Sequence, residues 1–227
     1  MNRLYLPDAE NPYQRDVLFA VELLDPVSLT LVSRNVTVAA PPLARRPRLS
    51  FGGRFVWLRE GNAWPDKVIV DPGELPYERE EQGRPPLPAD PEHPLEVELL
   101  ARVVLRPTRA YPFPDGVTVV RGRFDESAAA PPQRITDAEV WLQWFDSDTG
   151  DWSGDAASTF TRTGDSGEFA AFLRLAPSAK PQEGPGGLMK VRLRARRPLQ
   201  PTRSGPAMLV PQGRAFSPFQ ALAWNDF

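Results

Sequence analysis

The stretch Leu188–Arg197 has the sequence LMKVRLRARR and decides the fold class. Its apolar residues Met189, Val191, Leu193 and Ala195 alternate with Lys190, Arg192, Arg194 and Arg196. Successive side chains of a β-strand point to opposite faces of the sheet, so this alternation predicts a strand with one buried face and one basic, solvated face. The odd positions from Leu95 to Leu105 are likewise apolar and predict a second long strand.

The remaining strand candidates are rich in β-branched and aromatic residues and are bounded by Pro, Gly, Asp and Ser. They are Val17–Leu24, Asn35–Ala39, Arg54–Arg59, Lys67–Val70, Val117–Phe124, Ala138–Phe145, Ser158–Thr163 and Glu168–Leu175. With 27 prolines and 16 glycines in the chain, long helices are not expected. The prediction is an all-β protein made of two tandem antiparallel β-sandwich units with Pro-rich connections.

Composition divides the chain further. Residues 77–94 are dense in Glu, Pro and Arg, and residues 107–116 contain three prolines, so the domain boundary is expected between residues 77 and 116. The sequence does not decide whether the strand from Leu95 belongs to the first or the second half. The predicted segments are a 1–15 arm, a 16–76 sandwich, a 77–94 linker, a 95–116 strand with its connection, a 117–210 sandwich and a 211–227 aromatic tail.

Several classes of function find no support in the composition. The 227 residues include no cysteine and one histidine, which excludes disulfides, zinc–thiolate sites and His-rich metal sites. No cofactor is expected. The net charge of −2 makes nucleic acid an unlikely partner unless a local basic patch exists. No apolar run approaches the length of about 20 residues that crosses a bilayer, and the N-terminus lacks a secretory signal, so a cytoplasmic protein without a membrane span is expected.

The two halves share a short pattern. Gly53-Arg54-Phe55 and Gly167-Glu168-Phe169 each follow a turn and open a strand. Glycine at these positions is expected to supply the positive φ of a tight turn, and both phenylalanines are expected in the core. Duplication of one unit is a hypothesis that this short match leaves open.

The second half resembles the carboxypeptidase-regulatory or transthyretin-like β-sandwich family. The resemblance rests on 119-VVRGRF-124, 138-AEVWL-142 and 161-TRTGDSGEF-169, where Gly164 replaces the Asp that usually follows the Thr. It covers about 75 residues and extends weakly to the first half. The family resemblance implies an Ig- or transthyretin-like sandwich that serves as a rigid accessory or binding module. A related transthyretin-like hydrolase depends on several histidines, whereas this chain has only His93.

No catalytic or metal-binding residue is predicted. His93 lies in a Pro-rich loop, no Gly-x-Ser-x-Gly motif is present, and Gly184–Gly187 precedes a strand rather than a helix. The Asp146–Asp151 segment resembles half of a calcium loop, but Asp151 and Ala157 occupy the positions of the required Gly and Glu. An Asx-rich hairpin turn carrying Trp152 is the favoured interpretation.

Two surfaces are candidates for partner binding. Trp141 and Trp152 flank that turn, and both faces of the Ala138–Phe145 strand are apolar, so one face is expected to meet a domain or partner. Arg192 and Arg194 lie on the basic face described above. No neighbouring aromatic residues are expected on that face, and the chain is acidic overall, which favours a solvated face or a protein contact over a nucleic-acid groove.

The C-terminal segment supplies the remaining candidates. It contains four aromatic residues that need burial, either against the chain's own sandwich or in a neighbouring subunit: Phe216, Phe219, Trp224 and Phe227.

These observations predict a non-catalytic structural or adaptor protein that binds other protein subunits of a larger assembly, with homo-oligomerisation as one form. By analogy the assembly is a phage-tail-like contractile injection particle, released by lysis. The alternative is a carbohydrate- or surface-binding module that uses the Trp-rich hairpin. A glycosidase acting through two carboxylates is the third and least favoured hypothesis.

Overall fold

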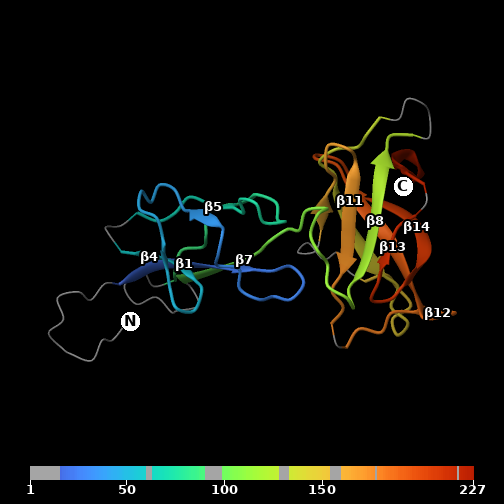
Figure 1. Ribbon diagram of the computed structural model, residues 1–227, viewed down its shortest axis with the longest axis horizontal. Helices are drawn as coiled ribbons and strands as arrows, with labels where there is room; N and C mark the ends of the chain where they lie inside the picture. Colours follow the sequence, from blue (N-terminus) through green and yellow to red (C-terminus); the bar gives the residue numbers. More distant parts are fainter. Residues whose placement is uncertain are drawn as a thin grey trace. The chain divides into compact units, whose positions relative to one another are not determined.

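The computed structural model is all-β, as the alternation predicts (Figure 1). It describes residues 16–59, 63–89, 99–127, 133–153, 160–176, 178–218 and 220–227. Within these ranges helical structure is limited to 3₁₀ geometry, at Leu99 and in the turn η2 (Trp224–Asp226). The chain divides into two compact units, Met1–Leu105 and Arg106–Phe227, called unit 1 and unit 2 below.

Unit 1 contains two small sheets. The first has the strand order β3 (Arg48–Leu49), β4 (Phe55–Leu58), β1 (Val17–Leu24) and β7 (Leu100–Val104). The second has the order β2 (Thr37–Ala39), β5 (Val68–Asp71) and β6 (Glu80–Gln82). Phe19, Val21 and Trp57 of the first sheet share one core cluster with Val38 and Val70 of the second. The sheets therefore enclose a common core, although β1 and β7 pair in parallel rather than antiparallel.

Unit 1 also contains a charge held in a largely buried position. Glu22 of β1 accepts hydrogen bonds from Arg54 Nε at 2.6 Å and Arg102 Nε at 3.0 Å. Its burial alone would raise the pKa of this carboxyl, but the hydrogen bonds and charges of the two guanidinium groups outweigh burial and lower it. The charge of Arg54 is thus neutralised by an ion pair within unit 1.

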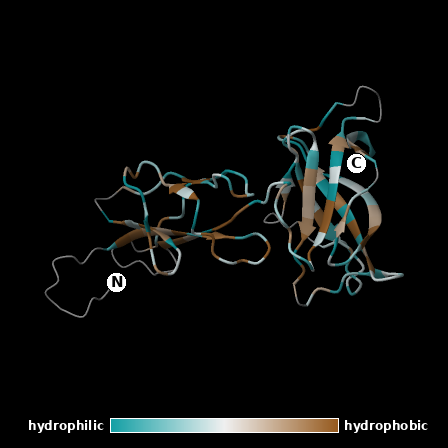
Figure 2. Ribbon diagram, in the orientation of Figure 1, coloured by the Kyte–Doolittle hydropathy of each residue, from teal (hydrophilic) through white to brown (hydrophobic). Residues whose placement is uncertain are grey.

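Unit 2 is a larger two-sheet structure. One sheet has the order β10 (Thr161–Arg162), β9 (Glu139–Trp144), β13 (Leu188–Arg196) and β12 (Glu183–Gly184), with β14 (Arg203–Pro211) also paired to β13. In the other, β8 (Thr118–Asp125) pairs with β11 (Glu168–Leu173), β15 (Ala215–Phe216) and β16 (Leu222–Ala223). Figure 2 shows the hydropathy alternating along these strands, and the apolar side chains form one core cluster.

The structure revises the predicted segments. Strand β7, which lies in the strand predicted from Leu95, pairs with β1 and therefore belongs to unit 1. Residues 77–94 are not all linker, because β6 pairs with β5 and buries Glu80. The tail is not separate from the second sandwich, because β15 and β16 both pair with β8. The predicted 1–15 arm lies outside the described residues.

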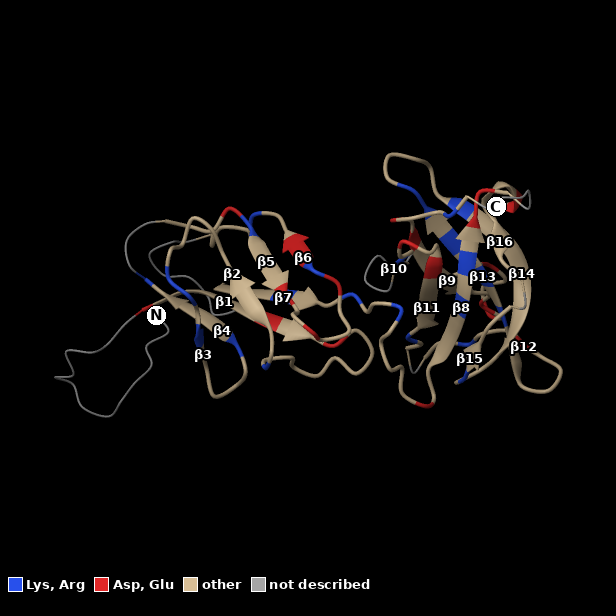
Figure 3. Cartoon of the chain, turned by 45° about the horizontal axis from the view of Figure 1, so that its top comes forward, with Lys and Arg blue, Asp and Glu red and all other residues tan. Residues whose placement is uncertain are grey.

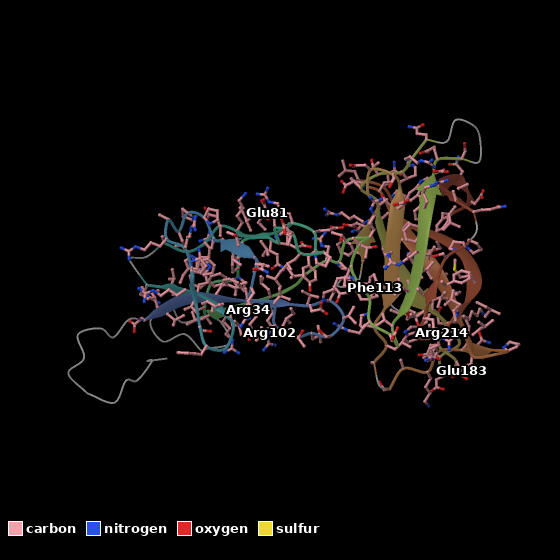
Figure 4. All side chains as sticks on the ribbon, viewed as in Figure 1. Arg34, Glu81, Arg102, Phe113, Glu183 and Arg214 are labelled. Atoms are coloured by element: carbon pink, nitrogen blue, oxygen red, sulfur yellow. The ribbon has the colours of Figure 1, made fainter. Side chains whose placement is uncertain are left out.

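The Pro-rich connection is packed rather than simply extended. Tyr111 is buried, and its ring lies 4.8 Å from that of Phe113, measured between centroids. Phe113, labelled in Figure 4, also lies 5.3 Å from the ring of Phe172 in β11. These aromatic contacts attach residues 111–113 to unit 2.

The two predicted glycine turns have the same local geometry. Gly53 donates to the carbonyl of Ser50 and Gly167 to that of Gly164, and both glycines have φ of 75°. The following phenylalanines, Phe55 and Phe169, are buried as expected. The strand orders around the turns differ, because β3 and β4 pair with each other whereas β10 and β11 lie in different sheets. The likeness between the halves is therefore one of turn geometry.

Candidate binding surface

The pairing of β13 with β9 creates the candidate site. Met189, Val191, Leu193 and Ala195 are fully buried, as predicted, so the basic residues of β13 lie on the outer face of the sheet. In the antiparallel register Arg192 lies opposite Gln143, and Arg194 lies opposite Trp141. Residues far apart in the sequence are thereby brought side by side.

Aromatic rings lie among these cations. The Arg192 guanidinium carbon is 4.4 Å from the ring centroid of Trp152, and the Lys190 ammonium nitrogen is 3.9 Å from that of Phe145. Arg194 is 6.0 Å from the ring of Trp141, at the limit of a cation–π contact. We call this surface the Arg–Trp face; its members are Trp141, Phe145, Trp152, Lys190, Arg192 and Arg194.

The expectation that the basic face lacks aromatic neighbours is wrong. The aromatic residues come from β9 and from the turn after it, where a bridge pairs Phe145 with Trp152 and their rings meet edge-to-face at 5.4 Å. Inspection of one strand could not show this, because the neighbouring strand is set by the fold. The apolar outer side of the Ala138–Phe145 strand was the available signal.

A buried amide holds the two arginines in place. Gln143 is 3% exposed, and its Oε1 accepts hydrogen bonds from Arg192 Nε at 2.8 Å and from Arg194 Nη1 at 3.3 Å. Its Nε2 donates to the carbonyl of Ser153 at 2.6 Å. The guanidinium groups therefore have a defined orientation, which reduces the entropy lost when they bind a ligand. Sequence reasoning missed Gln143 because a glutamine in a strand carries no distinguishing pattern.

The turn that carries Trp152 is the predicted Asx-rich hairpin turn. Asp146 Oδ1 accepts hydrogen bonds from the backbone nitrogens of Asp148, at 2.8 Å, and Thr149, at 3.3 Å. The Asp148 carboxylate pairs with Lys180 at 2.8 Å, and this contact raises the pKa of the lysine. The carboxylates thus stabilise the turn. Among the described residues no group of three or more His, Cys, Asp or Glu side chains could hold a metal ion, and His93 lies outside them.

Two of the predicted contact residues are buried instead. Trp141 is 5% exposed although it points away from the core, and Trp224 is 1% exposed. Trp224 packs edge-on against Phe124 at 5.7 Å and belongs to the core of unit 2. Burial removes both indoles as direct contacts for a partner.

Of the two alternatives for the tail, the structure shows the first for three of its aromatic residues. Phe216 and Phe227 are partly buried and pack against the same core, and Phe227 meets Phe124 edge-on at 4.9 Å. Phe216, Trp224 and Phe227 are therefore part of the chain's own sandwich rather than free docking residues. Phe219 lies outside the described residues.

Unit 1 contains a further feature that the sequence analysis missed. A cleft of about 330 Å³ lies between residues 42–48 and β4. Its lining includes the apolar side chains of Leu18 and Trp57 and three arginines, Arg45, Arg46 and Arg48. The signal was available as the run ARRPR at residues 44–48. The net charge of the whole chain is only −2, so the composition did not point to this basic run.

Comparison with known proteins gives no family. No family model matches the chain, and no curated protein matches it. Among solved structures it matches "The Bacillus anthracis TIE protein" with 8% identity and a TM-score of 0.25, over 92% of this chain and 34% of that one. The chain thus spans about a third of the length of that structure. A TM-score of 0.25 does not assign a fold family, so the carboxypeptidase-regulatory resemblance stays a prediction.

The structure bears on the membrane prediction in one respect. No helix in the described part of the chain is long and apolar enough to cross a bilayer.

Proposed function

We propose that this chain is a non-catalytic structural or adaptor protein, which binds another protein of a larger assembly through the Arg–Trp face. The observation that carries the proposal is the pairing of Arg192 with Trp152 on the outer face of a sheet, held by Gln143. Arginine and tryptophan are the residues most enriched among those that dominate the affinity of protein interfaces. An ordered arginine beside an aromatic ring is the arrangement such an interface needs.

The charge of the face determines the partner's chemistry. Its members include three basic residues, Lys190, Arg192 and Arg194, so two copies of the chain that face each other through it would bring like charges together. An acidic surface on a different subunit is therefore the favoured partner, and a homo-oligomer through this face is not. That the assembly is a phage-tail-like contractile particle stays a prediction from the sequence.

The carbohydrate-binding alternative is less well supported by the geometry. A sugar stacks on an open aromatic face, but Trp141 is buried and Arg192 lies over the ring of Trp152. Phe145 meets the same indole edge-on. These contacts leave the hairpin better suited to a protein surface that receives a cation and a ring together.

The test is cross-linking of the tagged full-length chain to its neighbours in source-cell extract, with Arg192→Glu and the matched variant Arg174→Glu. Arg174 is exposed in unit 2 outside the Arg–Trp face, so its reversal changes net charge equally. Loss of the cross-linked subunit with R192E alone is expected. Retention of every cross-link by R192E would contradict the proposal, and quenching of tryptophan fluorescence by a glycan would favour the alternative.

A further inference from the structure

One part of unit 1 is strongly basic although the whole chain carries a net charge of −2. Residues 26–59 contain no Asp or Glu and six arginines: Arg34, Arg45, Arg46, Arg48, Arg54 and Arg59. Figure 3 shows basic residues on both sides of the turn between β3 and β4, whereas acidic residues mark β6. The charge of unit 1 is therefore unevenly distributed.

The turn between β3 and β4 presents apolar side chains to solvent. Phe51 is 115% exposed and Leu49 is 52% exposed. Leu31, 43% exposed, lies beside them, because its Cδ1 is 3.6 Å from the point that a Cβ on Gly53 would occupy. Three large apolar side chains thus gather around one hairpin tip.

The hairpin tip is an ordered structure. Gly53 N donates to the Ser50 carbonyl at 3.0 Å, and Ser50 N donates to the carbonyl of Arg54 at 2.9 Å. The Ser50 hydroxyl accepts a further hydrogen bond from Arg54 N at 3.1 Å. These bonds hold Phe51 at the end of a closed turn, where no core contact requires a phenylalanine.

Two arginines next to this tip lack an acidic partner in the described part of the chain. Arg46 and Arg48 are exposed and line the cleft beside β4. Arg54 differs from them because Glu22 neutralises it. Arg46 and Arg48 are therefore cations that an external anion can reach at this surface.

We propose that unit 1 binds the surface of anionic lipid bilayers through this hairpin, with Phe51 and Leu49 inserted at the boundary of headgroups and acyl chains. Arg46 and Arg48 then lie at the level of the lipid phosphates. Peripheral membrane binding combines these two contributions, apolar insertion and attraction of basic residues to anionic lipid.

The shape of the hairpin favours a bilayer over other anionic partners. A stable protein interface buries about 800 Å² on each partner, which a single narrow tip does not offer. A single-stranded nucleic acid requires several aromatic rings for successive bases, and Phe51 is the only ring at this tip. A bilayer interface needs no matching pocket. The inference concerns unit 1 and goes beyond the function proposed for the Arg–Trp face.

The experiment is sedimentation of the full-length chain with vesicles of phosphatidylcholine alone or mixed with phosphatidylserine. Binding to the mixed vesicles at low salt, its loss at high salt and no binding to phosphatidylcholine are expected. Arg46→Ala and Arg48→Ala each lower the partition coefficient about fivefold, because each basic residue near an anionic surface contributes a comparable attraction. Phe51→Ser weakens binding to the mixed vesicles at each salt concentration at which the wild type binds.

The matched control is Leu199→Ser. Leu199 is 108% exposed at the turn between β13 and β14, but the neighbouring Arg196 and Arg197 are paired with Glu139 and Glu126. This variant should bind as the wild type does. Because Phe51 is fully exposed, F51S should keep the wild-type melting temperature. The proposal is overturned if the chain does not bind the mixed vesicles, or if F51S binds them as tightly as L199S does. It is also overturned if the chain binds single-stranded DNA more tightly than vesicles at equal ionic strength.

Discussion

At the scale of single residues, positive-φ glycines fix the turns that bring strands together. Gly150 and Gly167 have φ of 70° and 75°, but their surroundings differ. A Cβ on Gly167 would lie 2.6 Å from the carbonyl oxygen of Phe124, whereas nothing lies within 4 Å of one on Gly150. The sequence predicted the positive φ of Gly167. It gave no indication of this close approach to the backbone of another strand.

Comparison of Gly167→Ala with Gly150→Ala separates these two effects. The left-handed conformation alone should cost about 1 kcal/mol in each variant, since a Cβ crowds the following carbonyl there. G167A should cost at least about 2 kcal/mol more, because a backbone carbonyl cannot turn aside as a flexible side chain can. Urea unfolding of unit 2 measures both. Equal losses of stability would show that the Phe124 contact relaxes without cost.

At the scale of strands, the sequence predicted the bounds of two long strands accurately. The Val17–Leu24 strand was predicted with its observed bounds, and Leu188–Arg197 differs from β13 by one residue. Strand β14 was missed because Gly205 and Pro206 interrupt its pattern. The short strands β12, β15 and β16 contain two residues each, too few to show a period.

The prediction of the site was incomplete because the sequence of one strand does not show which strand pairs with it. Arg192, Arg194 and Trp152 were selected from the sequence for different reasons, and the antiparallel register of β9 with β13 joins them. Alternation tells which face a residue occupies but not which strand lies beside it. The content of the Arg–Trp face was therefore partly predictable, and its cation–π contacts were not.

The C-terminal tail gives a prediction at this scale. Trp224→Ala should lower the free energy of unfolding of unit 2 by about 3–5 kcal/mol, because the indole is fully buried between Phe124 and the guanidinium group of Arg197. Asn225→Ala, at an exposed position of the same turn, should change it little. Thermal unfolding at several protein concentrations provides the measurement. A melting temperature of W224A that falls on dilution would show that the tail of a neighbouring subunit fills this place.

At the scale of the whole chain, the boundary between the units could be located only within a broad range. Strand β7 follows the Pro-rich residues 77–94, yet it pairs in parallel with β1, the first strand among the described residues. Such a pairing joins residues about 80 positions apart, and no local pattern reports it. Among the described residues, 83–89 and 108–116 of the predicted Pro-rich segments lie outside strands, but long-range pairing decided which strand belongs to which unit.

This division predicts that fragments 1–105 and 106–227 each fold alone. The strands of each unit pair within that unit, and each unit has its own cluster of buried residues. Calorimetry of the two fragments should therefore give two cooperative transitions whose sum reproduces the trace of the full chain. Gly167→Ala provides the internal control, since it should displace only the transition of fragment 106–227 and lower its midpoint by about 4 °C for each kcal/mol lost. A fragment 1–105 that is unfolded in isolation would contradict the boundary at residue 105, and would mean that unit 1 depends on residues after β7 for its stability.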